Sequence, residues 1–295
     1  MERQAAVHVP VLCSELLHWL KPRDKGVYVD ATLGLGGHSR AILTASGPDS
    51  RVIAFEWDDE ALQIAVEGLR NFGGRFMAIP QSYIWLEKEL LRLEMAQVDG
   101  LVADLGVSSL QLDNGMRGFS FRNEAPLDMR MNNKQGRTAA DLVAQLSESE
   151  LADLFYYFGE ERQARRIAKF LVLARGKAPI STTIDLADLV AAAVPRKYHP
   201  SKVHVATRVF QALRIAVNGE LENVGKLLAA AEVVLKPGAR IGVITFHSLE
   251  DRMVKQAFGG GKFRPLQKKP IVATQEEVIA NPRARSAKLR VAERI

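Results

Sequence analysis

The segment from Val27 to Ser39 constrains the fold most strongly, because an apolar run leads directly into a glycine-rich turn. Gly34, Gly36 and Gly37 let the backbone approach a ligand where a Cβ atom would collide. The residues that follow predict a helix, whose first amide groups are donors without partners in the helix itself. A strand, a turn and a helix in this order predict a cofactor site.

A second apolar run, residues 51–56, ends in Glu56, 26 positions after Asp30. In a doubly wound sheet, an acid at the end of the second strand binds ribose hydroxyls, so the cofactor is predicted to contain a nucleoside. No Gly-Lys-Ser/Thr sequence occurs between Gly34 and Ser39, which argues against phosphoryl transfer.

Strand and helix patterns alternate over the first hundred residues. Apolar runs rich in β-branched residues occupy 27–30, 51–56, 76–79 and 98–103, and amphipathic segments at 60–70 and 84–93 separate them. This order predicts an α/β fold with a parallel sheet and helices on both faces.

The alternation stops after Asp104, and helical patterns follow at 139–146, 148–158, 161–174 and 184–193. A long helical stretch, 205–235, precedes a strand pattern at 240–246, and residues 288–295 alternate as a last strand would. We therefore expect one Rossmann-like domain, residues 1–111 and 204–295, and a mainly helical insert, 112–203, that recognises the substrate.

Three strings in this chain carry a family resemblance. Asp30 to Ser39, Asp104 to Ser109 with Gln111, and Phe246 to Arg252 resemble the RsmH (MraW) family of bacterial rRNA cytosine-N4 methyltransferases. The spacing of Asp30, Gly34, Gly36 and Gly37 is also similar to motif I of class I S-adenosylmethionine (SAM) methyltransferases. Further agreement lies at 117–121, 126–131, 159–162 and 281–286, so the resemblance covers nearly the whole chain.

The resemblance implies a class I fold, SAM as cofactor and a cytidine of 16S rRNA near the decoding centre as target, in an assembled or nearly assembled small subunit. It also implies SAM contacts at Gly36, Gly37, His38, Glu56, Tyr83, Asp104 and Gln111. Glu56 would accept from ribose hydroxyls, Tyr83 would pack on adenine, and Asp104 and Gln111 would hydrogen-bond polar groups of SAM. Two alternatives stay open: Tyr83 as a core aromatic, and His38 bonded to backbone.

The chain departs from the family pattern at two places. Glu56 and Trp57 stand where related proteins generally have Asp and a polar residue, and Leu110 stands where proline is usual. A carboxylate that is one methylene longer still reaches a diol if the backbone retracts slightly, so we expect cofactor binding to persist.

The chain has a single cysteine, Cys13, far in sequence from these motifs. Methylation of a pyrimidine carbon normally needs a cysteine nucleophile, so an exocyclic amine is the expected substrate. Asp104 is the first candidate for the proton acceptor and Ser108 the second. The Asn/Asp-Pro-Pro-aromatic motif of other amine methyltransferases is absent, which leaves the assignment open.

No metal site is expected, because the cluster His247, Glu250, Asp251 and Arg252 contains one histidine and its acids fit the first turn of a helix. No apolar run approaches the length of a membrane span. One cysteine excludes an intramolecular disulfide, so we expect a cytoplasmic protein. The oligomeric state is not predicted.

Positive charge is concentrated at the C-terminus. The net charge is +6, and residues 252–295 hold eleven Lys/Arg against three Asp/Glu. These cations would bind RNA phosphates or form a solubilising surface; the eight candidates are Lys262, Arg264, Lys268, Lys269, Arg283, Arg285, Lys288 and Arg290.

The predicted insert holds further candidates for RNA binding. Residues 115–122 mix cations with aromatics, which suits base stacking, although we favour packing in the insert core for Phe119, Phe121 and Met129 to Met131. Arg162, Arg165, Arg166 and Lys169 are expected to form a basic helix face.

Three functions stay open from the residues alone. They are an RNA cytidine N4-methyltransferase, a methyltransferase for another amine in DNA or a small molecule, and a noncatalytic RNA-binding assembly factor with a SAM fold. The long family motifs favour the first.

Overall fold

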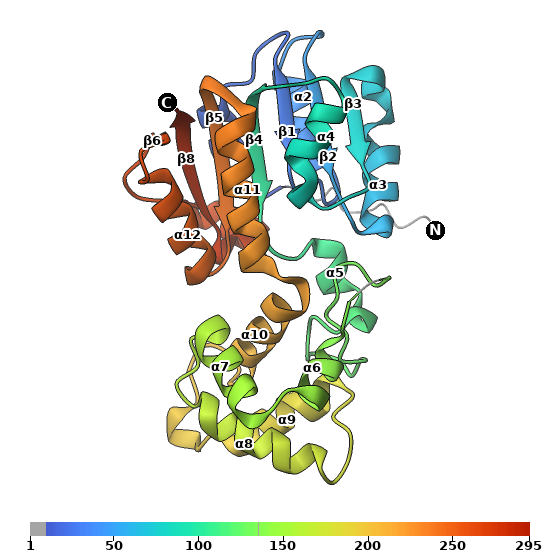
Figure 1. Ribbon diagram of the computed structural model, residues 1–295, viewed down its shortest axis with the longest axis vertical. Coiled ribbons are helices and arrows are strands. Elements are labelled where there is room, and N and C mark those ends of the chain that lie inside the picture. Colours follow the sequence, from blue (N-terminus) through green and yellow to red (C-terminus); the bar gives the residue numbers. More distant parts are fainter. Residues whose placement is uncertain (1–9, 135) are drawn as a thin grey trace. The chain divides into compact units, whose positions relative to one another are not determined.

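The computed structural model describes residues 10–134 and 136–295, which form two compact units (Figure 1). The sheet unit runs up to Gly106 and resumes at Leu221, and the helical unit comprises Val107–Glu220. The helical unit is thus larger than the expected insert, 112–203, at both of its ends.

The sheet unit contains a single sheet with the strand order β3-β2-β1-β4-β5-β8-β6, and β7 also pairs with β8. Its first five strands are parallel, whereas β6, β7 and β8 are antiparallel to their partners. The strands are β1 (Val27–Asp30), β2 (Arg51–Phe55), β3 (Phe76–Ile79), β4 (Val98–Asp104), β5 (Leu235–Thr245), β6 (Phe263–Pro265), β7 (Ile271–Val272) and β8 (Lys288–Arg294). This topology is the α/β fold that the alternating pattern predicts.

Helices cover both faces of this sheet because successive strand residues point to opposite sides. On one face, Val29 and Leu101 share an apolar cluster with α4 (Leu86–Arg92), α11 (Glu220–Val234) and α12 (Ser248–Phe258). On the other, Tyr28 and Val102 share a cluster with α1 (Cys13–Leu20), α2 (Gly37–Ala45) and α3 (Asp59–Leu69). Figure 1 shows α4 and α11 lying over the first of these faces.

The helical unit has an apolar core of its own. Its helices are α5 (Ser109–Asp113), α6 (Ala139–Gln145), α7 (Glu148–Gly159), α8 (Ala164–Arg175), α9 (Thr183–Ala193) and α10 (Thr207–Asn218). Helix α10 lies beyond the expected end of the insert, but Val209, Phe210 and Leu213 are buried in this core, which explains why the unit extends further.

The single helical stretch expected at 205–235 is wrong in two respects. Gly219 has a left-handed backbone (φ 61°), which ends α10 and separates it from α11. Strand β5 begins at Leu235 and not at 240, and its pairing with β4 shifts register between Val98 and Gly100. Lys236-Pro237-Gly238, a sequence that typically follows the end of a helix, therefore lies within β5, because Leu235 and Arg240 on either side of it both pair with β4.

Within the described part of the helical unit, the strand-like pairing is one isolated bridge between Pro126 and Thr182. Among the described residues, no helix combines the length and the apolar character that crossing a membrane would take.

Candidate cofactor and active site

The glycine turn is anchored by a buried acid at the end of β1. The carboxylate of Asp30 accepts hydrogen bonds from Ser39 Oγ at 2.7 Å and from the Thr32 amide at 3.1 Å. Burial raises the pKa of this carboxyl above its ordinary value. Asp30 thereby joins the end of the strand to the first turn of α2.

The three glycines have different roles in this structure. A Cβ on Gly36 would lie 2.9 Å from Leu69 Cδ1, and one on Gly37 would lie 3.0 Å from Pro10 Cβ. At Gly34 (φ 52°), the nearest atom to an added Cβ would be the Thr32 carbonyl oxygen, at 4.0 Å. The space at Gly36 and Gly37 is therefore needed for packing within the chain, whereas the sequence pattern attributes it to a ligand.

Glu56 follows β2 and fastens the same turn from the neighbouring strand. Its Oε2 atom accepts from the Gly34 amide at 2.9 Å, and Oε1 accepts from the amides of Trp57 and Asp58, each at 2.9 Å. Burial raises the pKa of Glu56 to about 7, while these hydrogen bonds oppose the rise. A carboxylate has about four acceptor positions, so Glu56 retains the capacity to accept from a ribose hydroxyl.

His38, in the first turn of α2, is bonded to backbone, which was one of its two alternatives. Its Nε2 atom lies 3.0 Å from the carbonyl oxygen of Val11, and its Nδ1 atom lies 3.9 Å from Asp104 Oδ2. With Nε2 donating to the carbonyl, His38 presents Nδ1 to the Asp104 carboxyl group.

Asp104 is the last residue of β4, at the carboxyl edge of the sheet. Its amide donates to Thr32 Oγ1 at 2.6 Å, and one carboxylate oxygen, Oδ1, is buried without a hydrogen-bond partner in the described part of the chain. Burial raises the pKa of Asp104 to about 6, against the opposing effect of His38. Buried acceptors are rarely left unsatisfied, so this oxygen marks a position for a donor from a ligand.

Tyr83 lies in η2 (Tyr83–Trp85), and its partly buried ring packs against the apolar cluster that contains Ile79 and Leu86. This packing matches the core alternative for Tyr83. The contact with adenine stays a prediction, because an aromatic ring that packs on one side is able to stack on the other.

Ser108 and Gln111 belong to the helical unit, where they form a capping box at the start of α5. The Ser108 hydroxyl accepts from the Gln111 amide at 3.2 Å, and Gln111 Oε1 accepts from the Ser108 amide at 3.0 Å. Both side chains therefore have a structural task that the sequence analysis missed, although the Ser-x-x-Gln spacing is its signal. Their roles toward SAM and in catalysis stay predictions.

The cluster after β5 is a helix cap. His247 Nδ1 accepts from the Glu250 amide at 3.4 Å, and Glu250 Oε2 accepts from the amides of Phe246 and His247 at 2.9 and 3.3 Å. This is the capping arrangement expected for the start of α12.

The C-terminal cations differ in exposure and in whether they are already paired with a carboxylate. Arg290 donates to both carboxylate oxygens of Asp251, at 2.6 and 3.1 Å, and Lys288 Nζ lies 3.7 Å from the same group. The side chain of Arg290 is only 10% exposed. The expectation that Arg290 is available for phosphate is therefore wrong, whereas Lys262, Lys268, Lys269 and Arg285 are exposed.

In the helical unit, Phe119 and Phe121 pack against the core, as we favoured.

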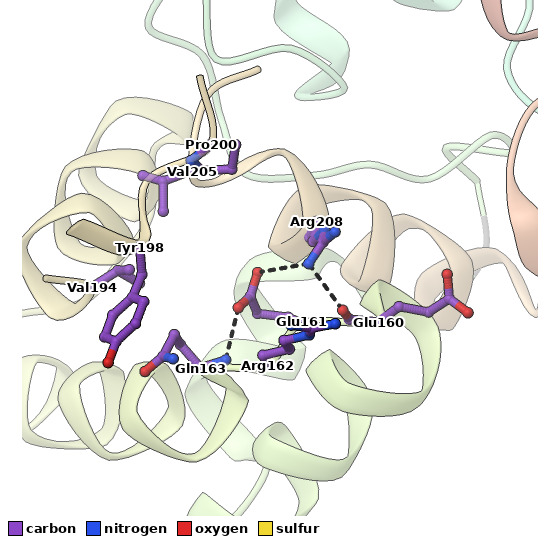
Figure 2. Close-up of a pocket in the computed structure, with 9 residues that line it drawn as sticks. All are labelled: Glu160, Glu161, Arg162, Gln163, Val194, Tyr198, Pro200, Val205 and Arg208. Carbon is purple, nitrogen blue, oxygen red and sulfur yellow. Dashed lines mark hydrogen bonds and ion pairs between the residues drawn. The ribbon is translucent and has the colours of Figure 1, made fainter. Parts of the chain in front are cut away.

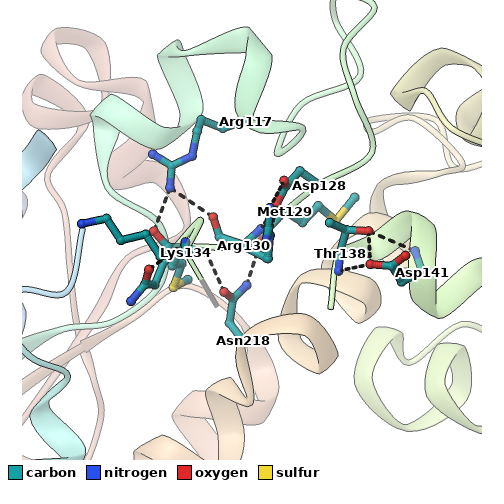
Figure 3. Close-up of polar contacts among 10 residues, drawn as sticks. Arg117, Asp128, Met129, Arg130, Lys134, Thr138, Asp141 and Asn218 are labelled. Carbon is teal, nitrogen blue, oxygen red and sulfur yellow. Dashed lines mark hydrogen bonds and ion pairs between the residues drawn. The ribbon is translucent and has the colours of Figure 1, made fainter. Parts of the chain in front are cut away.

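The loop that follows Phe121 is held in place by the polar side chains of Asn218 and Arg117, as Figure 3 shows. Asn218 Nδ2 donates to the Met129 carbonyl and its Oδ1 accepts from the Met131 amide, each at 2.8 Å. Arg117 donates to the Met131 carbonyl at 2.7 Å and to the Arg130 carbonyl at 3.1 Å. Arg130, on this loop, donates to both carboxylate oxygens of Asp128, each at 2.8 Å, so its charge is already paired.

A mainly parallel sheet whose first turn is glycine-rich, with an acid at the carboxyl end of each of three adjacent strands, fits the SAM-dependent methyltransferase class to which the family match assigns the chain. SAM is the cofactor, and the ammonium group of its methionine part is a donor that suits the unpartnered oxygen of Asp104. The chain belongs to the MraW methylase family, whose model matches residues 5–295.

Similar proteins carry names that are consistent with this family assignment. The chain is 49% identical over 290 residues to ribosomal RNA small subunit methyltransferase H of Desulfotalea psychrophila, with 98% of each chain covered. It is 50% identical to the protein of that name in Sorangium cellulosum, over 98% of this chain and 91% of the other. A solved structure named PH0851 has 11% identity and a TM-score of 0.50, over 98% of this chain and 47% of its own, and shows the fold alone.

Proposed function

We propose that this protein transfers the methyl group of SAM to the exocyclic N4 of a cytidine in 16S rRNA. The substrate is an assembled or nearly assembled small ribosomal subunit in the cytoplasm, and the target lies near the decoding centre. Family membership and the names of the relatives support the reaction class. The observation that carries the proposal is the buried, unpartnered Oδ1 of Asp104 at the carboxyl edge of β4.

When bound, SAM supplies an electrophilic methyl group on a sulfonium centre. The sheet unit would hold it through three features. The turn at Gly34–Gly37 would lie against the methionine part, Glu56 would accept from the ribose hydroxyls, and Asp104 would accept from a polar hydrogen. The hydrogen bonds from the backbone to Glu56 fix the acceptor in advance, so that little conformational entropy is lost on binding.

The single thiol of the chain does not suit methylation at a ring carbon. Cys13 lies in α1, and burial raises the pKa of its thiol above its ordinary value, which disfavours the thiolate. The thiolate is the nucleophile that addition to a pyrimidine ring requires. An amine carries its own lone pair and needs no covalent catalyst, which favours N4 over C5 of cytosine.

Transfer to N4 leaves a proton that the protein must accept. Asp104, whose pKa is about 6, is ionised at pH 7 to 8 and therefore able to accept it. Ser108 is the second candidate, but its hydroxyl caps α5 and has an ordinary alcohol's weak basicity. Asp104 is accordingly proposed both to bind and to accept a proton.

Mass spectrometry tests the reaction directly. Small subunits from cells that lack this enzyme are incubated with the protein and SAM carrying a heavy methyl group, and the RNA nucleosides are then analysed. The proposal predicts heavy label on cytosine N4. Label in DNA or small metabolites, on ring carbon C5, or SAM binding without transfer to subunits would each contradict it.

Asp104→Asn separates binding from chemistry. If the carboxylate accepts the proton, turnover stays depressed at saturating SAM, since the amide keeps the size but loses the charge. Ser108→Ala, measured in parallel, compares the second candidate. Full turnover of Asp104→Asn at saturating SAM would limit Asp104 to cofactor binding.

The exposed C-terminal cations are proposed to contact RNA phosphates. A variant with Lys262, Lys268, Lys269 and Arg285 changed to Gln should bind small subunits more weakly and with a shallower salt dependence. Arg290→Gln is the structural comparison, because Arg290 is paired with Asp251. An unchanged affinity and salt dependence in the folded quadruple variant would indicate that these residues form a solubilising surface and do not contact RNA.

A further inference from the structure

The helical unit contains a cavity of about 650 Å³ that the reaction proposed above does not use (Figure 2). Every residue that lines it belongs to the helical unit. The lining comes from the connection between α7 and α8 (residues 160–163), the residue that follows α9, the short helix η4 (Arg196–Tyr198) with the loop after it, and the start of α10. Its volume falls within the range of roughly 300–1,000 Å³ that is usual for small-molecule sites.

One end of the cavity is apolar and aromatic. Val194 and Val205 are buried there, and the ring of Tyr198 is 52% exposed. His199 Nε2 lies 3.0 Å from the Val194 carbonyl oxygen, which ties the turn that carries Tyr198 to the end of α9. Lys197 Nζ lies over the Tyr198 ring, 4.9 Å from its centroid, so a planar aromatic ligand would stack on the other face of this ring.

The other end is polar and carries charges of both signs, the guanidinium groups of Arg162 and Arg208 beside the carboxylates of Glu160 and Glu161. Glu161 is 8% exposed, and its Oε1 accepts from the Gln163 amide at 2.7 Å while Oε2 lies 3.9 Å from Arg208 Nη1. Arg208 Nη1 also donates to the Glu160 carbonyl at 3.1 Å. In the view of Figure 2, Tyr198 lies to the left of Gln163 and Arg208 to its right, beside Glu161.

Three side chains keep donors for a ligand. Only the Nη1 group of Arg208 is bonded in the described part of the chain, which leaves most of its five donors. Within the same residues, the Arg162 guanidinium and the Gln163 side-chain amide have no partner, and both face this cavity. Arginine forks suit phosphate oxygens, and a glutamine amide both donates to and accepts from a base edge.

A ligand has to satisfy both ends of the cavity at once. An apolar molecule would bury the arginines without partners, and an isolated phosphate would leave Tyr198 and the valines uncovered. A nucleotide has a flat base and an anionic phosphate at the two ends of one unit, and thus matches both. We propose that this cavity binds one unpaired nucleotide of the substrate RNA, with its base on Tyr198 and its phosphate between Arg162 and Arg208.

This inference rests on the proposed function only in taking RNA as the source of the nucleotide. A free nucleotide has the same chemistry, so the test includes both. The bound nucleotide would be one other than the methylated cytidine, because none of the residues proposed to bind SAM or to accept the proton lines this cavity.

The first experiment measures the affinity of the full-length protein for purified small-subunit RNA and for free UMP and AMP. Tyr198→Ala should weaken RNA binding at least about fivefold, whereas Tyr198→Phe keeps the ring and should bind as the wild type does. Arg162→Gln should weaken binding and reduce the magnitude of the logarithmic salt slope by about one. SAM affinity and Tm, measured on each variant, report whether the fold is intact.

Arg165→Gln is the matched control, since Arg165 is an exposed arginine of α8 that does not line the cavity. Equal losses in Arg162→Gln and Arg165→Gln would indicate a diffuse electrostatic surface and overturn the site. Tyr198-dependent binding of UMP or AMP together with RNA binding that ignores Tyr198 would assign the cavity to a free nucleotide, which also overturns the proposal.

Photo-crosslinking with RNA that contains 4-thiouridine locates the base. A crosslink within residues 194–205 that Tyr198→Ala abolishes supports the proposal, and crosslinks that Tyr198→Ala leaves unchanged contradict it. Nucleoside mass spectrometry of the wild type keeps the two proposals apart. Tyr198-dependent RNA binding without N4 label would refute only the reaction, and N4 label with RNA binding indifferent to Tyr198 and Arg162 would refute only the cavity.

Discussion

Asp104→Asn should stabilise the protein in the absence of SAM while it weakens SAM binding. Burial raises the pKa of Asp104 from 3.8 to about 6, so the folded protein binds this proton more tightly than the unfolded chain does. The free energy of unfolding therefore falls as pH rises from about 4 to about 6, and the full loss is present at pH 8. A difference of about two in pKa is worth about 3 kcal/mol, the upper limit of the gain.

The asparagine amide is itself polar and buried, so we expect a net gain of about 1–2 kcal/mol at pH 8. For a protein of this size, each kcal/mol raises Tm by about 2–4 °C. At pH 4, where the wild-type carboxyl is largely neutral, the two proteins should differ little. Calorimetric scans of both proteins between pH 4 and 8 measure this difference, and the other titrating groups, Glu56 among them, cancel in the comparison.

Saturating SAM should reverse the order of stability. At a hundred times Kd, a ligand raises the free energy of unfolding by about 2.7 kcal/mol, and the variant should lose most of this gain at the same SAM concentration. A Tm difference between the two SAM-free proteins that is constant from pH 4 to 8, or a less stable variant at pH 8, would refute the reasoning about the buried carboxylate.

Three further substitutions test the residues around the turn and the last strand. Gly36→Ala should lower the free energy of unfolding by about 1–3 kcal/mol, because the φ of 82° is strained for alanine and its Cβ would lie 2.9 Å from Leu69 Cδ1; an unchanged urea midpoint would contradict this. Glu56→Ala should cost about 2 kcal/mol and Glu56→Gln less, since glutamine keeps one acceptor oxygen; equal urea midpoints for the two variants would show that the bonds to the backbone contribute little. Arg290→Gln should cost about 1–3 kcal/mol, because it removes two hydrogen bonds to the Asp251 carboxylate and leaves it, among the described residues, only the Lys288 ammonium 3.7 Å away; a variant with wild-type Tm and weaker RNA binding would make Arg290 a phosphate contact after all.

Six of the eight strands in the described part of the chain could be predicted, because each contains a short run of β-branched and apolar residues, whereas the short antiparallel strands β6 and β7 carry no such run and were not predicted. The acids at the strand ends, Glu56 and Asp104, could be placed for the same reason, since parallel strands bring their carboxyl ends to one edge. The break at Gly219 was missed, although Asn218-Gly219 is a common helix-ending pair. Local pattern therefore predicts most of the architecture.

Contacts between distant residues could not be predicted from local pattern. The Gly34 amide meets a carboxylate 22 positions away, and Arg290 meets Asp251 across 39 positions. The space beside Gly36 is taken by Leu69 of α3, which no motif specifies. Such partners depend on tertiary packing, and they decide whether a charged residue is available to a ligand or is already used by the fold.

The insertion of the helical unit into the chain of the sheet unit also has a consequence for folding kinetics. Strands β4 and β5 are neighbours in the sheet, yet more than a hundred residues of the helical unit separate them along the chain. Closing so long a flexible loop costs about 2 kcal/mol more than closing a ten-residue connection. Within the described part of the helical unit, α7 packs on α8 and α8 on α9, and such contacts between successive helices form quickly, while α10 packs back on α7. We therefore expect the helical unit to fold first and to shorten the effective loop, so that substitutions in its core slow the pairing of β4 with β5 even though they touch neither strand.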